Sequence, residues 1–186
     1  MLLSLATILF LNLNVYAQSR TVEIYGNTTL GYYYLEAYVG TPPQKKALII
    51  DTGSHITIFD CEECLNCGKH LYQPFKHSVS SSFEYVTPNK VYFNWNCNKR
   101  FVTDSRCTFT QLYSENSSYS GYYAVDNFLF ENEVNNSINA NLKHIFGCAI
   151  LETNLFISQE VDGIIGFGVS DLVSILISAI TSTYHT

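Results

Sequence analysis

A carboxylate stands at the end of a short apolar run near the middle of the N-terminal half. Residues 48–50 are aliphatic and lead directly into Asp51, Thr52, Gly53 and Ser54. Such a run is typical of a buried strand, where a lone carboxylate is costly unless it is paired, hydrogen-bonded or held neutral. An acid in that setting can transfer protons to and from a bound water or substrate. The alternative is a structural Asp in a turn, because Asp and Gly are both turn residues.

Cysteines are the second group of residues that can do chemistry. The sequence contains Cys61, Cys64, Cys67, Cys97, Cys107 and Cys148. The first three, together with His70, have the spacing of metal ligands, so a zinc or iron–sulfur site is one interpretation. An even number of cysteines in an oxidising compartment favours disulfides instead, and the spacing does not fix their connectivity. We expect disulfides and no metal, because the N-terminus predicts such a compartment.

The N-terminus resembles a secretory signal. Residues 2–11 are almost wholly apolar, and residues 15–17 resemble a small-residue cleavage site. We therefore expect residues 1–17 to be a signal peptide and residues 18–186 to be one domain of a secretory-pathway protein. No segment reaches about 18 uninterrupted apolar residues, so we predict no membrane anchor within this sequence. Candidate glycosylation tripeptides begin at Asn27, Asn116 and Asn135.

Composition limits the class of protein. The chain has 186 residues, of which 47% are hydrophobic and 14% charged, and this balance favours a packed core over disorder. The net charge is −6 and the lysines and arginines do not cluster. We therefore expect no nucleic-acid partner.

The elements that must position these residues are mostly strands. Runs rich in aromatic and β-branched residues lie at 32–39, 47–50, 84–86, 91–95, 107–113, 122–130 and 143–150. A turn cluster at 40–44 joins the first two runs into a hairpin that ends at Asp51. Residues 61–82 are expected to form a cysteine-stapled loop and residues 132–141 an asparagine-rich loop. Only 170–180 has helical spacing, so the predicted class is mainly β with one short helix near the C-terminus.

Taken in order, four segments resemble those of the pepsin-like aspartic proteases. They are the hairpin 32–44 that runs into Asp51, a flap-like stretch at 111–126, the segment 145–148, and Asp162-Gly-Ile-Ile-Gly-Phe-Gly168. The resemblance covers most of residues 31–180 and implies the N-terminal lobe of such an enzyme. The cysteine pattern is similar to that of the nepenthesin-type and plasmepsin V-type enzymes within the family. That resemblance implies the disulfides Cys61–Cys64, Cys67–Cys148 and Cys97–Cys107.

The resemblance also implies a reaction. Aspartic proteases use two carboxylates about 3 Å apart that share one proton. One carboxylate activates a water while the other polarises the scissile carbonyl, and neither a metal nor a cofactor takes part. Asp51 would be one of the two, and Thr52, Gly53 and Ser54 would form the loop around it, with Ser54 able to hydrogen-bond the carboxylate.

Other matched residues receive supporting roles from the same resemblance. Tyr113 and Ser114 would belong to the flap that closes over a peptide substrate. Asp162, Gly163 and Gly166 would belong to the strand that closes a psi-shaped loop around Asp51.

The sequence departs from the family pattern in three places. The flap tip lacks the usual glycine and carries the tripeptide at Asn116, where a glycan would hinder closure. His55 follows the acid loop, and we expect a partly buried strand histidine there in preference to a pH switch. Neither Asp-Thr-Gly nor Asp-Ser-Gly occurs again after Asp51, so a second catalytic aspartate is not visible.

Three hypotheses follow for function. In the first, the chain is the lobe of an aspartic endopeptidase that lacks its C-terminal lobe and is inactive alone. In the second, two copies meet across a two-fold axis and each supplies Asp51. In the third, the chain is a non-catalytic protein that binds peptides. The partner is a peptide or protein in every case, and the first two also require a second carboxylate from a missing lobe or a second subunit.

Overall fold

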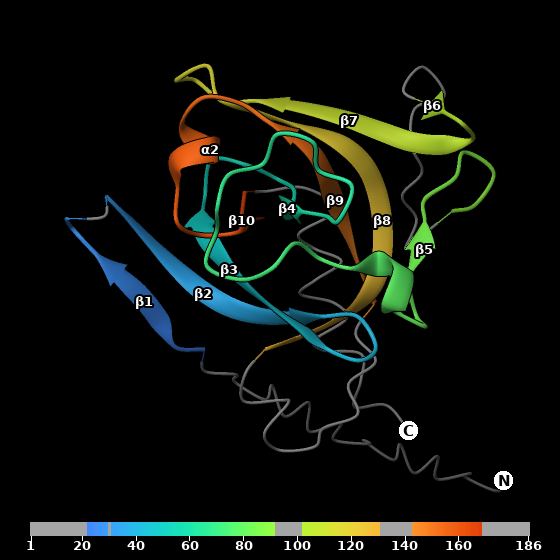
Figure 1. Cartoon of the computed structure of the whole chain (residues 1–186), viewed down its shortest axis with the longest axis horizontal. Coiled ribbons are helices and arrows are strands. Elements are labelled where there is room, and N and C mark those ends of the chain that lie inside the picture. Colours follow the sequence, from blue (N-terminus) through green and yellow to red (C-terminus); the bar gives the residue numbers. More distant parts are fainter. Residues whose placement is uncertain (1–21, 30, 92–101, 131–142, 169–186) are drawn as a thin grey trace, which may run out of the picture.

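The computed structural model describes residues 22–29, 31–91, 102–130 and 143–168. Within these ranges it confirms a mainly β architecture, and they contain one short α-helix (Figure 1). The strands are β1 Ile24–Asn27, β2 Tyr32–Val39, β3 Gln44–Asp51, β4 Ile58–Asp60, β5 Glu84–Tyr85, β6 Val102–Thr103, β7 Arg106–Leu112, β8 Ser118–Phe130, β9 Lys143–Glu152 and β10 Gly163–Gly166. The helices are the 3₁₀ helix η1 His77–Val79 and the α-helix α2 Leu155–Ser158.

Most of the predicted strands are present. The runs at 32–39, 47–50, 84–86, 107–113, 122–130 and 143–150 all fall within or across strands. Most of the run 91–95, the loop 132–141 and the helix expected at 170–180 lie outside the described residues. The sequence did not predict β1, β4 or α2, which are only three or four residues long. Elements this short have too few positions to show a periodic pattern.

The described strands form one strongly bent sheet. Its order is β1-β2-β3-β10-β4-β9-β8-β7-β6, and β5 pairs with β8. The long strand β8 also pairs with β2 at Ala37 and Phe130, so the strands from β2 to β8 along this order form a closed ring (Figure 1). The core lies inside this curve, where the rings of Phe59 and Phe146 stack with centroids 4.6 Å apart.

Strand β10 lies between β3 and β4. It runs parallel to β3, with Gly166 opposite Asp51, and antiparallel to β4, with Gly163 opposite Phe59. A Cβ atom at Gly163 would lie 2.0 Å from the carbonyl oxygen of Ile58, so only glycine allows this close approach. The psi-shaped arrangement of β3, β10 and β4 therefore places Asp51 at the end of a strand that is paired on both sides.

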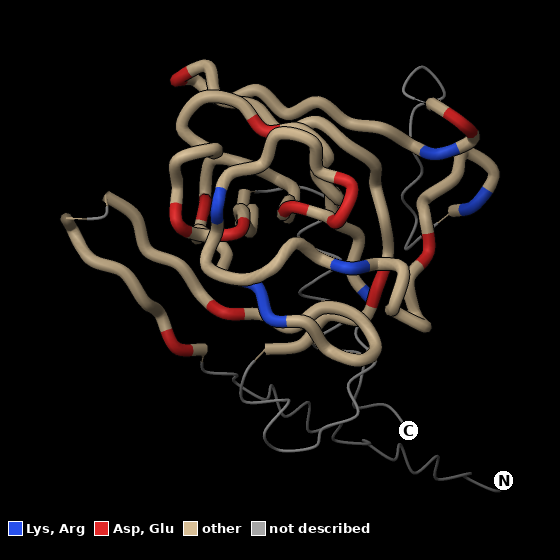
Figure 2. The backbone as a smooth tube through the Cα atoms, viewed as in Figure 1, with Lys and Arg blue, Asp and Glu red and all other residues tan. Residues whose placement is uncertain are grey.

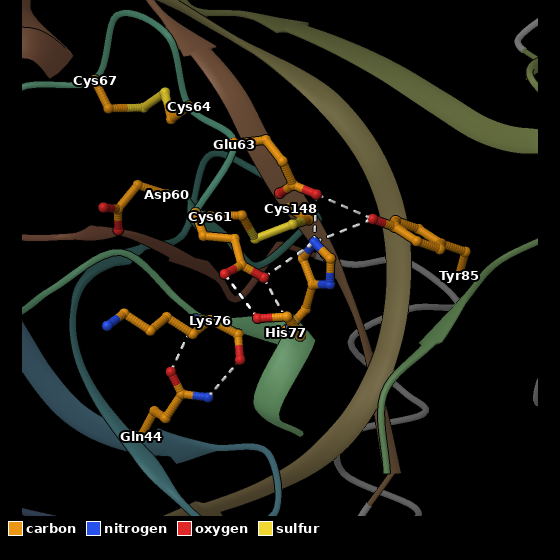
Figure 3. Close-up of a disulfide and its surroundings, with 12 residues drawn as sticks. Gln44, Asp60, Cys61, Glu63, Cys64, Cys67, Lys76, His77, Tyr85 and Cys148 are labelled. Carbon is orange, nitrogen blue, oxygen red and sulfur yellow. Dashed lines mark hydrogen bonds and ion pairs between the residues drawn. A yellow bond between two sulfur atoms is a disulfide. The ribbon is translucent and has the colours of Figure 1, made fainter. Parts of the chain in front are cut away.

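Two disulfides join the predicted loop 61–82 to itself and to the sheet (Figure 3). They are Cys61–Cys148 and Cys64–Cys67, so the predicted pairs Cys61–Cys64 and Cys67–Cys148 are wrong. The reason is topological: β4 runs parallel to β9 with Phe59 opposite Cys148, so Cys61 emerges beside Cys148 at a Cα separation of 5.5 Å. These bonds also remove the thiolates that a metal site at 61–70 would need.

The third predicted disulfide involves Cys107. Cys107 is disulfide-bonded, and Cys97, its predicted partner, lies outside the described residues.

The described lysines and arginines are spread over different strands and loops (Figure 2). Among the described residues, no helix has the length and apolarity needed to cross a bilayer.

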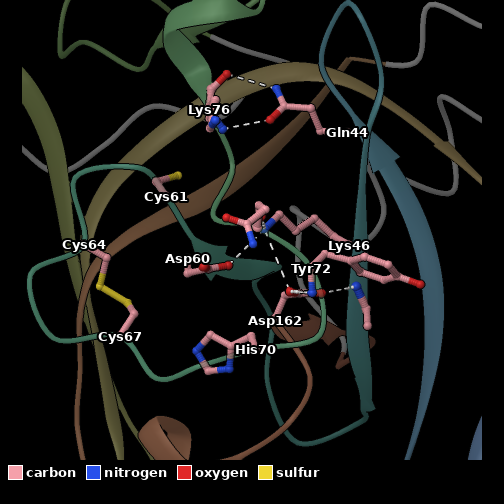
Figure 4. A network of polar contacts seen from close by, with 12 residues as sticks. Gln44, Lys46, Asp60, Cys61, Cys64, Cys67, His70, Tyr72, Lys76 and Asp162 are labelled. Atoms are coloured by element: carbon pink, nitrogen blue, oxygen red, sulfur yellow. Dashed lines mark hydrogen bonds and ion pairs between the residues drawn. A yellow bond between two sulfur atoms is a disulfide. The ribbon is translucent and has the colours of Figure 1, made fainter.

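A buried ionic network links Lys46 of β3 to Asp60 of β4 and to Asp162, which immediately precedes β10 (Figure 4). Lys46 is fully buried, and its Nζ lies 3.0 Å from Asp60 Oδ1 and 4.0 Å from Asp162 Oδ1. The second oxygen of Asp162 accepts a hydrogen bond from the backbone N–H of Ala47 at 2.6 Å, and Oδ1 accepts one from Tyr72 at 2.8 Å. Burial raises the pKa of both Asp60 and Asp162, and the Lys46 charge opposes that rise. Asp162 therefore holds β3 in place and has no exposed surface for chemistry.

His70 connects the cysteine-rich loop to Glu152 at the end of β9. Its Nδ1 lies 2.9 Å from the carbonyl oxygen of Gln159, and its Nε2 lies 3.0 Å from Glu152 Oε2. Both partners are acceptors, so both ring nitrogens donate and the ring is the imidazolium. Burial opposes this charge, but the hydrogen bond and the charge of Glu152 together raise the pKa of His70.

Candidate active site

The carboxylate of Asp51 is held by the loop that follows β3. The backbone N–H of Gly53 donates a hydrogen bond to Asp51 Oδ1 at 2.8 Å, and the N–H of Phe167 donates to the Asp51 carbonyl oxygen at 2.7 Å. Asp51 is half-buried, while Thr52 and Gly53 are exposed. The carboxylate is thus fixed in orientation and still open to solvent on one side.

The strand β10 fixes the second half of this loop. The N–H of Gly168 donates to the carbonyl oxygen of Ser54 at 2.8 Å. A Cβ atom at Gly166 would lie 2.7 Å from the backbone nitrogen of Ile56 and 2.8 Å from the Ser54 oxygen. Glycine is therefore required at Gly166 for the strand to lie this close to the acid loop.

Tyr113 lies beside the acid loop, immediately after β7. Its ring packs edge-on against Phe156 of α2 at 5.0 Å and against Tyr119 of β8 at 6.4 Å. Burial raises the pKa of Tyr113 to about 12; the nearby Ser54 hydroxyl opposes this rise and the Asp51 charge adds to it. The ring of Tyr113 also packs against the apolar cluster that contains Ile56, two residues after Ser54.

Two buried hydroxyl groups in this region lack a partner. Neither Ser54 Oγ nor Tyr113 OH makes a hydrogen bond within the described part of the chain. The hydrogen bond that we expected from Ser54 to the carboxylate of Asp51 is therefore not formed. A buried hydroxyl without a partner costs about 1–3 kcal/mol, so two of them beside one carboxylate are an unusual local arrangement.

The remaining predicted residues fall in three places. Ser114 is exposed in the turn between β7 and β8, with its Oγ 3.4 Å from Glu115 Oε2. His55 is exposed in the connection between β3 and β4, so the expectation of a partly buried strand histidine is wrong. Asn27 and Asn116 are exposed, and Asn135 lies outside the described residues.

The sequence did not identify the residues that pack around Tyr113 or the cation that pairs with the buried acids. Phe156 and Tyr119 form the aromatic wall, with their rings stacked at 4.0 Å, and Lys46 neutralises the buried acids. Lys46 gave little signal of burial, because it follows Gln44 and Lys45 at the polar start of β3. Phe156 gave no signal, because it belongs to a helix of four residues. Within the described ranges, no group of three or more His, Cys, Asp or Glu side chains is arranged to hold a metal ion.

The chain matches one protein-family model and is similar to several known proteins. Residues 33–185 match the family model described as xylanase inhibitor N-terminal. Plasmepsin V of Plasmodium falciparum is 30% identical over 151 residues, which are 80% of this chain and 25% of that protein. Aspartic protease 5 of Toxoplasma gondii is 34% identical over 157 residues, covering 77% of this chain and 16% of that protein. Aspartic proteinase nepenthesin-2 of Nepenthes gracilis is 30% identical over 101 residues, covering 54% and 23%. The chain thus spans a quarter or less of the length of these relatives.

Proposed function

The chain belongs to the pepsin-like aspartic proteases and represents the N-terminal lobe of their fold, and from this premise we propose that it carries one half of a peptidase active site. The reaction is the hydrolysis of a peptide bond, and Asp51 is one of the two carboxylates that activate water. The observation that supports this most is the carboxylate itself. It is oriented by the Gly53 N–H at 2.8 Å, is open to solvent, and lies beside the buried phenol of Tyr113.

In the proposed reaction the two acids have different roles. Two carboxylates that share one proton hold a water between them. The ionised one takes a proton from this water as it attacks the scissile carbonyl carbon, and the protonated one donates a hydrogen bond to the carbonyl oxygen. The Gly53 N–H occupies Oδ1 of Asp51, so Oδ2 is the oxygen available to the water. The ring of Tyr113 excludes bulk solvent from one side of the reacting atoms.

The second carboxylate comes from outside the described residues in this proposal. Asp162 is unsuited because its two oxygens accept hydrogen bonds from Ala47 and Tyr72 and it is fully buried. Asp60 is unsuited because Lys46 holds it in the core. A second lobe or a second copy of the chain is therefore needed, and a lone copy is expected to be inactive.

The proposed compartment and substrate follow from the disulfides. Cys61–Cys148 and Cys64–Cys67 suit an oxidising environment, which favours the secretory pathway. We accordingly take the substrates to be proteins that pass through that pathway, bound as extended segments along the turn that contains Tyr113.

A second candidate function is binding without hydrolysis. The description of the matching family model names an inhibitor, so a lobe of this type is compatible with a role other than cleavage. The intact Asp51 loop favours the peptidase.

One experiment separates the two functions. The chain is incubated with a mixture of unstructured peptides, and mass spectrometry records both cleaved products and peptides retained on the protein. Wild type is compared with Asp51→Asn and with the control Asp104→Asn, whose side chain is 75% exposed. Cleavage that is lost only in Asp51→Asn supports the peptidase. Retention of intact peptides by all three proteins, with no cleavage in any assembled state, supports the binding protein.

A further inference from the structure

The turn between β7 and β8 is attached to the segment that follows β9. We call residues 113–117 the flap turn and residues 152–156 the platform. Asn154 Nδ2 donates a hydrogen bond to the carbonyl oxygen of Asn116 at 2.7 Å, and the backbone N–H of Leu155 donates to Ser117 Oγ at 3.2 Å. Ser117 is fully buried in this contact.

A second set of bonds joins the two segments at the start of β8. The N–H of Ser118 donates to Thr153 Oγ1 at 2.8 Å, and the N–H of Thr153 donates to the Ser118 carbonyl oxygen at 3.1 Å. The two hydroxyl oxygens lie 2.9 Å apart. Thr153 is thus bonded to Ser118 through both its backbone and its side chain.

The flap turn is also closed on itself. The N–H of Tyr113 donates to the carbonyl oxygen of Ser117 at 2.9 Å, and the N–H of Asn116 donates to the carbonyl oxygen of Tyr113 at 3.0 Å. Asn116 and Asn154 have φ angles of 68° and 53°, a region that Asn tolerates better than most residues. Fixing Asn116 and Ser117 therefore also fixes Tyr113, whose ring already packs on Phe156 of the platform.

We infer that the platform holds the flap turn, and with it the ring of Tyr113, in place beside the acid loop before any substrate binds. Thr153 and Asn154 are then positioning residues for Tyr113. This inference deepens the proposed function and rests on it for its meaning in catalysis. A cover that is already in place does not have to be ordered when a peptide binds, so less conformational entropy is lost at that step. The site then admits peptide segments that enter lengthwise beneath a fixed turn.

Hydrogen exchange of single amides tests the attachment directly. Thr153→Val removes the hydroxyl that accepts from Ser118 while keeping the shape of the side chain, and Thr153→Ser retains that hydroxyl. Because one such bond is worth about 1 kcal/mol, exchange at Tyr113, Asn116 and Ser118 should accelerate about fivefold in Thr153→Val. Thr153→Ser should exchange at these amides like wild type.

Asn154→Gly tests the second bond without adding backbone strain. Glycine tolerates the positive φ of Asn154, and the substitution removes the side chain that carries the Nδ2 donor. The control is Ser120→Ala, which breaks a hydroxyl contact to Thr110 within the same hairpin but does not touch the platform. Faster exchange of the Asn116 amide in Asn154→Gly and not in Ser120→Ala is the expected result. Unchanged exchange in both Thr153→Val and Asn154→Gly overturns the inference.

The phenol of Tyr113 gives a readout that a merely structural role would not change. NMR titration of tyrosine labelled at Cζ follows its ionisation, which burial places at a pKa of about 12. Loosening the flap turn should move this titration toward the ordinary value of 10, whereas Thr153→Ser should leave it unchanged. The peptide-cleavage experiment with Asp51→Asn is independent of these readouts. A fixed turn with retained intact peptides and no Asp51-dependent cleavage in any assembled state refutes only the proposed function. Cleavage beneath an unattached turn refutes only this inference.

Discussion

Replacing Lys46 with methionine should destabilise the fold strongly, because this residue is the cation that compensates two buried acids. Its side chain is 0% exposed, with Nζ 3.0 Å from Asp60 and 4.0 Å from Asp162. Removing one partner of a buried ion pair costs about 3–5 kcal/mol, since the remaining charge stays buried. The neighbouring Lys45 provides a matched control. Its side chain is 29% exposed and pairs with Glu36, whose side chain is 10% exposed. Because Glu36 keeps a hydrogen bond from the Tyr72 hydroxyl when Lys45 is replaced, we expect a smaller loss in Lys45→Met than in Lys46→Met.

Urea unfolding of both variants across a range of pH is the assay. Burial raises the pKa of Asp60 and Asp162 in the folded state, so they accept protons more readily there than in the unfolded chain. Without Lys46, the cost of the two charges is therefore greatest at neutral pH and decreases as the pH falls and they become protonated. A loss of stability in Lys46→Met that equals the loss in Lys45→Met, or that does not change with pH, would refute this reasoning.

Three further predictions concern the site and its supports. Tyr113→Phe should leave stability unchanged or raise it by about 1 kcal/mol, because it removes a buried hydroxyl without a partner; thermal unfolding measures this. Replacing Cys61 and Cys148 together by serine should cost about 2–5 kcal/mol in urea unfolding, because their disulfide closes a long loop. His70→Gln should remove a stabilisation that wild type has in full below about pH 6.5 and loses as the pH rises through the raised folded pKa, measured by unfolding against pH.

Each of these three predictions has a control or a result that would contradict it. A loss of more than about 2 kcal/mol in Tyr113→Phe would mean that its hydroxyl has a stabilising partner. Replacing Cys64 and Cys67, which are three residues apart, should cost less than replacing the long-range pair, and peptide mapping that finds Cys67 joined to Cys148 would contradict the fold. Stability of the wild type that is constant above about pH 6.5 would contradict the charged state of His70.

The sequence predicted the parts of the fold that depend on local pattern. Strand β2 is rich in aromatic residues and β3 contains the aliphatic run 47–50, and the Asp162-Gly-Ile-Ile-Gly segment lies beside β3 as the resemblance implied. Asp51 could be singled out because a carboxylate at the end of an apolar run needs an explanation. The position of Tyr113 depends on the pairing of β7 with β8, which the local pattern of residues does not determine.

The wrong or missing predictions concern features that depend on contacts between distant parts of the chain. The spacing of Cys61, Cys64 and Cys67 does not reveal that β4 runs parallel to β9, and this pairing is what brings Cys61 to Cys148. The exposure of His55 depends on the path between two strands, which no periodicity describes. The attachment of the flap turn depends on Thr153 and Asn154, two polar residues whose partners are 35 and 38 positions away.

Peptide cleavage measured on separated assembly states tests the central claim most directly. The chain is fractionated by sedimentation or gel filtration, and each fraction is assayed at acidic to neutral pH beside the same fraction of Asp51→Ala. The account predicts that the monomer does not cleave peptides, because Asp51 is only one of two required carboxylates. It also predicts that any fraction that does cleave contains a second source of that carboxylate and loses activity in Asp51→Ala. Cleavage by the monomer, or cleavage that survives the substitution, would contradict the assignment of Asp51 as half of a catalytic pair.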